Sequence, residues 1–180
     1  MEPSPGPEPT MFAEHAIIAT ATAQDANEDG VRPIAHLVKR GALYLWTLDG
    51  ADLEHSASTA IEAFAIGGRD LCDGARFMDV EWTPGSARLA LEETLANLEL
   101  DDVIVGYKLD EDKDDYAIVT FRVEYYEDNT DHGYTTATKS RIEAAETALK
   151  LHGLSCTNVG SDDRPGTDPD ERTEYFIFTA

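Results

Sequence analysis

Residues 75–159 show the same order of secondary structure twice. In Phe77–Trp82 apolar residues alternate with acidic ones, as in a half-buried strand, and leucines at helical spacing follow from about Ser86. Residues 121–126 form a second strand-like run, and a second helical pattern starts near Thr138. Each helical pattern leads into another short strand-like run. The sequence therefore predicts the order β-α-β, β-α-β for this part of the chain.

That order is typical of an α+β fold of the ferredoxin-like type, in which an antiparallel sheet carries helices on one face. We expect a ferredoxin-like βαββαβ core over about residues 75–180. Two strand-like runs follow the second helix, residues 154–159 and 175–178, and either or both could complete the sheet. The last run is so apolar that we expect it to be inserted in the sheet, because an exposed strand of this kind would aggregate.

The residues before this core predict an N-terminal extension made of a β-hairpin and a helix. Residues 33–39 and 42–48 flank Arg40-Gly41 and match the two arms of a hairpin with a two-residue turn. A helix is expected from Asp52, since apolar residues then recur at helical spacing.

The chain length suits one domain. Residues 1–10 hold four of the eight prolines and no periodic apolar pattern, which predicts a disordered tail. With 42% hydrophobic residues the rest of the chain can bury a core. We expect residues 11–180 to form a single α+β domain, with 11–74 and 75–180 as the sub-blocks into which it could divide.

Charge is the dominant feature of the composition. Aspartate and glutamate number 36 against 14 lysines and arginines, which gives a formal net charge of -22. Such a charge repels nucleic acid and anionic membranes, so both are poor partners. Two situations produce this balance: life in molar salt, or a surface that imitates the phosphates of DNA. The acids are spread along the chain and only five residues are lysine, which favours adaptation to high salt.

The sequence also indicates where the protein works. Residues 1–10 have neither a basic nor an apolar segment of the kind a signal peptide needs, and no run of about 18 apolar residues occurs. The only cysteines are Cys72 and Cys156. We therefore expect a soluble cytoplasmic protein with reduced thiols.

One acidic run resembles the start of a calcium-binding loop. Asp110, Asp112 and Asp114 occupy alternate positions, as the first ligands of such a loop do. The pattern then fails, because Asp115 stands where the loop needs glycine and Phe121 where it needs a bidentate glutamate. A charged hairpin tip is the better interpretation.

A second cluster, residues 127–132, mixes carboxylates with His132 just before a predicted helix. No second histidine or cysteine lies at ligand spacing nearby, and a helix N-terminus favours acidic residues without any metal. No catalytic or phosphate-binding motif occurs in the chain. The sequence thus predicts no metal, no cofactor and no catalytic residue, and favours a protein that is not an enzyme.

These two acidic runs are the candidate interaction residues. They are Asp110, Glu111, Asp112, Asp114, Asp115, Glu127, Asp128 and Asp131.

Three functional hypotheses follow. The favoured one is a small acidic protein of a halophilic organism or its virus that acts through contacts with a protein partner, which could be basic. Assembly into a homo-oligomer is compatible with all three hypotheses. The second is an inhibitor that imitates nucleic acid and blocks a DNA-binding defence or regulatory protein. The third is an enzyme whose site assembles from distant residues. Binding of RNA on the sheet is disfavoured, because Asp79, Glu81 and Glu124 are predicted to point outward from it.

Overall fold

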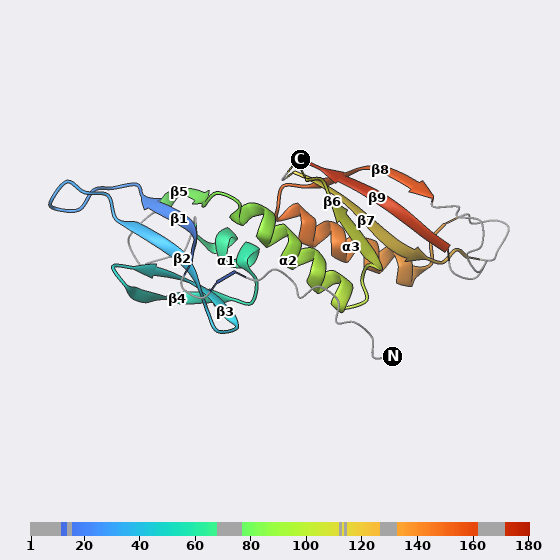
Figure 1. The fold of residues 1–180 in the computed structure, drawn as a ribbon, viewed down its shortest axis with the longest axis horizontal. Coiled ribbons are helices and arrows are strands. Elements are labelled where there is room, and N and C mark those ends of the chain that lie inside the picture. The colour runs from blue at the N-terminus through green and yellow to red at the C-terminus, as the bar shows by residue number, and fades with distance from the viewer. Residues whose placement is uncertain are drawn as a thin grey trace. The chain divides into compact units, whose positions relative to one another are not determined.

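A computed structural model of the chain describes residues 12–13, 16–67, 77–111, 113, 115–126, 133–161 and 172–180. In these residues the protein is of the α+β class, with antiparallel sheets and three helices (Figure 1). The chain divides into two compact units, Met1–Glu93 and Thr94–Ala180. The helix α2 (Ser86–Leu100) contains the division between them.

The first unit is built on a five-stranded antiparallel sheet of strand order β4-β3-β2-β1-β5. Its elements are β1 (Ile17–Ala23), β2 (Ile34–Arg40), β3 (Leu43–Leu48), β4 (Ala51–Ala57), α1 (Ala60–Ile66) and β5 (Phe77–Trp82). The predicted hairpin is confirmed as β2 and β3. The helix expected from Asp52 is wrong over its first turns, because Asp49 and Gly50 adopt positive φ and turn the chain back into β4.

The core of this unit forms around β3, which buries Tyr44 and Trp46. The indole Nε1–H of Trp46 donates a hydrogen bond of 2.7 Å to the carbonyl oxygen of Ala63 in α1. The ring of Phe64 stacks on Trp82 of β5 with a centroid separation of 3.9 Å. These contacts hold α1 against one face of the sheet.

One carboxylate joins three elements of the first unit. Glu93 of α2 accepts a hydrogen bond from the hydroxyl of Tyr44, and its second oxygen accepts one of 3.0 Å from the backbone N–H of Ala60. Ala60 is the first residue of α1, so the carboxylate satisfies a backbone donor that has no partner within the helix. Burial and Glu93 both raise the pKa of Tyr44, so the hydroxyl stays protonated and remains a donor.

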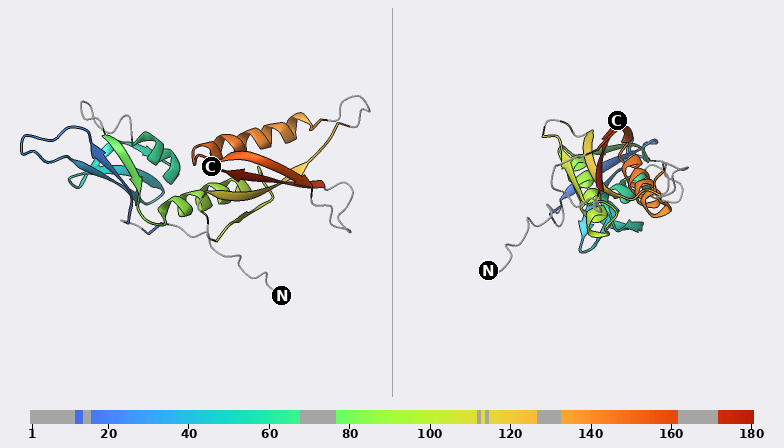
Figure 2. Two further views of the ribbon diagram at one scale, coloured as in Figure 1. Left: turned by 90° about the horizontal axis from the view of Figure 1, so that it is seen from above. Right: turned by 90° about the vertical axis from the view of Figure 1, so that its right-hand side faces the viewer.

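The second unit contains a four-stranded antiparallel sheet of order β6-β7-β9-β8. Its elements are the end of α2, then β6 (Gly106–Leu109), β7 (Tyr116–Val123), α3 (Thr136–Lys150), β8 (Ser155–Ser161) and β9 (Arg172–Thr179). The helix α3 runs along one face of this sheet (Figures 1 and 2). Its buried residues are Thr138, Ile142, Ala145 and Leu149.

The predicted ferredoxin-like βαββαβ core is not confirmed. That fold would place β5 between β7 and β8, but β5 pairs with β1 in the first unit, and β9 occupies the position between β7 and β8. The physical reason lies in composition. The strand β9 is apolar on both faces at Phe176, Ile177 and Phe178, which suits an interior strand, whereas β5 exposes acids on one face. Both strand-like runs after the last helix are paired, as one of the alternatives predicted.

The order that occurs twice is helix, strand, strand. Both α2 and α3 end with the same hydrogen bond, from Val103 N to Leu98 O at 2.9 Å and from Leu154 N to Leu149 O at 3.1 Å. In each case the residue before the donor has positive φ, Asp102 at 56° and Gly153 at 77°. This is a Schellman termination, and it directs each helix into the next strand.

The Glu93 link gives a stability test for the first unit. Glu93→Gln leaves only one good acceptor for two donors, and we expect a loss of about 1–3 kcal/mol in the free energy of unfolding. Trp46 and Trp82 both lie in this unit, so urea unfolding followed by tryptophan fluorescence reports it. The matched control is Glu92→Gln, which removes the partner of Arg88 at 3.4 Å and should cost less than about 0.5 kcal/mol. Equal losses in the two variants would contradict the role of Glu93.

His152 gives a pH test for the second unit. Its Nε2 lies 2.8 Å from the Thr94 hydroxyl, and burial lowers its pKa to about 4 from the usual 6.5. The unfolded chain therefore takes up a proton below pH 6.5 that the folded protein accepts only near pH 4. Stability should fall by about 2–3 kcal/mol as the pH drops through this window.

His152→Gln keeps a hydrogen-bonding group beside Thr94 but does not titrate, so it should lack this part of the pH dependence. Urea unfolding followed by circular dichroism at pH 7, 5.5 and 4 measures it. His55→Gln, at an exposed position in β4, serves as the control and should behave as the wild type. The prediction is wrong if the free energy of unfolding of His152→Gln falls with pH as steeply as that of the wild type.

Candidate interaction surface

The pairing of β7 with β9 sorts their side chains onto two faces. Ala117 lies opposite Phe178 and Val119 opposite Phe176, and these four side chains are buried on the face that α3 covers. The alternate residues point to the other face, since successive side chains of a strand point to opposite sides. They are half-exposed or exposed.

We call this second side the open face. Register with β6 and β8 extends it across the whole sheet. It consists of Gly106, Lys108, Tyr116, Ile118, Thr120, Arg122, Ser155, Asn158, Gly160, Thr173, Tyr175, Ile177 and Thr179.

The open face contains no acidic residue, whereas one residue in five of the whole chain is aspartate or glutamate. It carries two exposed cations, Lys108 and Arg122, and within the described residues neither side chain forms an ion pair. A third cation borders it, because Lys113 Nζ lies 5.5 Å from the centroid of the Tyr116 ring. The residues of the open face thus carry only positive charge, and Ile118 lies opposite Ile177 between them, while Asp110, Glu111 and Asp115 lie at the adjoining turn.

The middle of the open face is a row that crosses the sheet through Gly106, Thr120, Tyr175 and Gly160. The Tyr175 ring lies over Gly160, since a Cβ added to Gly160 would approach Tyr175 Cζ to 2.2 Å. At Gly106 no atom lies within 4 Å of an added Cβ. An aromatic platform and an open space therefore flank Thr120.

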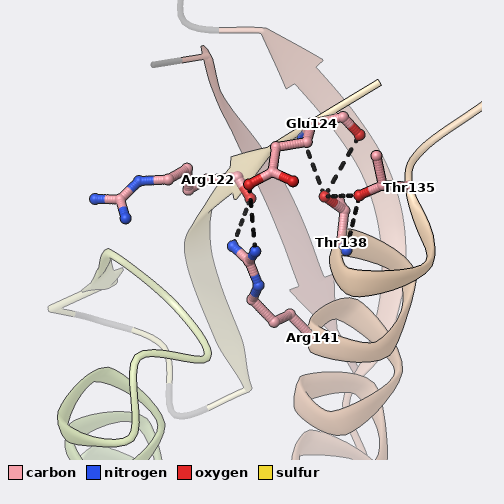
Figure 3. Close-up of polar contacts among 5 residues, drawn as sticks. All are labelled: Arg122, Glu124, Thr135, Thr138 and Arg141. Carbon is pink, nitrogen blue, oxygen red and sulfur yellow. Dashed lines mark hydrogen bonds and ion pairs between the residues drawn. The ribbon is translucent and has the colours of Figure 1, made fainter. Parts of the chain in front are cut away.

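The contacts at the end of β7 involve the backbone of Arg122 but not its guanidinium. Arg141 of α3 donates to the Arg122 carbonyl oxygen at 3.2 Å and pairs with the Glu124 carboxylate at 3.7 Å. The Thr138 hydroxyl accepts from the Glu124 backbone N–H at 3.0 Å, and Thr135 caps α3. Figure 3 shows the Arg122 guanidinium directed away from these groups. Among the described residues, Arg141 thus has an acidic partner and Arg122 has none.

A polar cluster around the buried Glu174 lies on the opposite side of the sheet. Glu174 accepts hydrogen bonds from the hydroxyls of Tyr125 and Tyr134, and the Arg172 guanidinium lies 5.8 Å from the centroid of the Tyr125 ring. Burial, followed by the bond to Glu174, raises the pKa of both tyrosines, so neither hydroxyl ionises near neutral pH. The cluster joins β9 to the bridge between Tyr125 and Tyr134 and has a structural role.

No other chemistry assembles in the described part of the chain. No group of three or more histidine, cysteine or acidic side chains there could hold a metal ion. Cys156 is a free thiol, and burial raises its pKa, which makes it less reactive.

The predicted interaction residues fall into two groups. Asp110, Glu111 and Asp115 lie at the turn between β6 and β7, outside the paired strand residues that make up the open face. Asp112, Asp114, Glu127, Asp128 and Asp131 lie outside the described residues.

The acidic residues on which the prediction against RNA binding was based are not part of the open face. Asp79 and Glu81 belong to β5 of the first unit, and Glu124 follows the end of β7 and pairs with Arg141. The strands β7 and β9 lack acids at alternate positions, but the predicted runs 121–126 and 175–178 cover only part of these strands, and the first run contains Glu124.

Comparison with known proteins adds no assignment: no protein-family model, curated protein or solved structure matches the chain. None of the helices among the described residues is long and apolar enough to cross a bilayer. The expectations of a high-salt habitat and of nucleic-acid mimicry stay predictions.

Two glycines of the central row provide a matched test of its shape. Gly160→Ala forces the Tyr175 ring to move, and we expect a loss of about 1–3 kcal/mol in the free energy of unfolding. Gly106→Ala enters open space at an ordinary φ and should be neutral or stabilising by up to about 1 kcal/mol. Chemical denaturation followed by far-UV circular dichroism compares them, and a greater loss for Gly106→Ala would contradict the described surface.

Proposed function

We propose that this protein is a non-enzymatic interaction module that binds another protein through the open face of its second unit. The observation that carries the proposal is the absence of carboxylates from this face in a chain with 36 acids. Carboxylates are costly to bury at the centre of an interface, so a surface that binds a partner is expected to exclude them.

The composition of the face supports the same conclusion. Ile118 pairs with Ile177 at its centre, and Tyr175 lies beside them. Burial of half-exposed side chains of this size supplies binding free energy at about 25 cal/mol per Å² of apolar area. Tyrosine and arginine are enriched in protein interfaces, and both are present here. Thr120, at the centre, is small enough to let a partner approach the sheet.

The test compares two variants that add the same charge at different places. Thr120→Glu puts a carboxylate at the centre of the open face, and Ala144→Glu puts one at an exposed position of α3. The chain and both variants are used to capture proteins from cells of its source organism, and the captured proteins are quantified by mass spectrometry.

We expect specific partners to be recovered with the wild type and Ala144→Glu, and to fall about tenfold with Thr120→Glu. Circular dichroism must show that both variants are folded. If Thr120→Glu and Ala144→Glu recover the same proteins in the same amounts, the open face is not the interface.

A further inference from the structure

The positions of the two exposed cations limit what the open face can bind. Lys108 lies opposite Ile118, and Arg122 is four residues further along the neighbouring strand. With a rise of about 3.3 Å per residue and strands about 4.8 Å apart, their Cα atoms are separated by about 14 Å. That separation is close to the distance between residues i and i+4 of an extended polypeptide.

The space between the two cations fits an apolar side chain. Midway along this span lies Thr120, opposite Gly106 on one side and Tyr175 on the other. The open space at Gly106 leaves room for this apolar side chain, which we call the anchor, and the ring of Tyr175 offers it an aromatic contact. In an extended segment, residues i, i+2 and i+4 point to the same side, so one segment can place all three groups on the face.

The charge of the open face distinguishes three ligands that it could bind: a second copy of the chain, a nucleic acid and a polypeptide segment. The face carries cations without carboxylates, so a second copy of the same face cannot neutralise it. A nucleic acid presents one phosphate per nucleotide and is repelled along its whole length by a chain of net charge -22. A polypeptide with two carboxylates meets that repulsion only twice and gains two local ion pairs.

We propose that the open face binds an extended polypeptide segment with carboxylates at positions i and i+4 and an apolar side chain at i+2. The inference rests on the proposed function and names the class of partner. Lys108 and Arg122 pair with the two carboxylates, and the apolar side chain lies over Thr120 between Gly106 and Tyr175.

The probe is a synthetic peptide with the core Glu-Ser-Leu-Ser-Glu, titrated into the isotopically labelled full chain and followed by NMR. We expect shift changes at open-face residues, and binding about tenfold weaker for the core Gln-Ser-Leu-Ser-Gln. Lys108→Glu with Arg122→Glu should abolish binding of the acidic peptide and gain binding of Lys-Ser-Leu-Ser-Lys. Lys139→Glu, an exposed cation of α3, is the matched control and should bind as the wild type.

Gly106→Leu gives a second variant that needs no charge change. Its side chain enters open space, so the protein should fold. Because the leucine occupies the place of the anchor, the affinity for the acidic peptide should fall about tenfold. The proposal is overturned if the peptide fails to bind, or if its affinity ignores both the charge reversal and Gly106→Leu.

Two other outcomes would also overturn the proposal. An oligothymidylate that binds the open face more tightly than the peptide would assign a nucleic acid, and self-association lost in the double variant would assign a second copy. The capture experiment separates the two levels of inference. If Thr120→Glu loses partners while the peptide does not bind, the segment class is wrong and the interaction surface stands.

Discussion

The antiparallel pairing of β7 with β9 is the constraint on which the account of this protein depends. Eight residue pairs, from Tyr116 with Thr179 to Val123 with Arg172, fix which side chains face α3 and which do not. A slip of one residue would expose Phe121 and Phe176 and bury Arg122. The burial of phenylalanine on one side therefore determines the composition of the other, and the open face is a consequence of the core.

The strand pairing also shows which positions of the sheet carry carboxylates and which do not. A net charge of -22 could reflect nothing more than a solvated surface, because repulsion among carboxylates is weakened by salt. Carboxylates that are tolerated on turns, on helices and in the first unit are nevertheless missing from thirteen positions of one sheet face. Strands disfavour aspartate and glutamate in general, yet β5 carries both on its exposed face at Asp79 and Glu81. Binding of a partner gives a reason for the exclusion from the open face, since a buried carboxylate without a partner is costly.

The sequence predicted the local elements better than their assembly. The predicted run 121–126 identified the end of β7 as a strand, and the helical pattern starting near Thr138 identified α3, because both signals depend on neighbouring residues. The partner of Phe77–Trp82 could not be predicted, since its pattern fits either sheet and the choice depends on which edge is vacant. The same error hid the open face: with Asp79 and Glu81 assigned to the wrong sheet, an acid-free surface was predicted to be acidic. The links through Glu93 and Glu174 join residues more than 30 positions apart and leave no local signal.

The most direct test of the open face is site-specific photo-crosslinking in cells of the source organism. A photoreactive benzoylphenylalanine replaces Thr120 at the centre of the open face in one protein and Ala144 on the exposed side of α3 in another. The account predicts discrete adducts with a protein partner from position 120 and none from position 144. Adducts that form equally from both positions, or from position 144 alone, would contradict it.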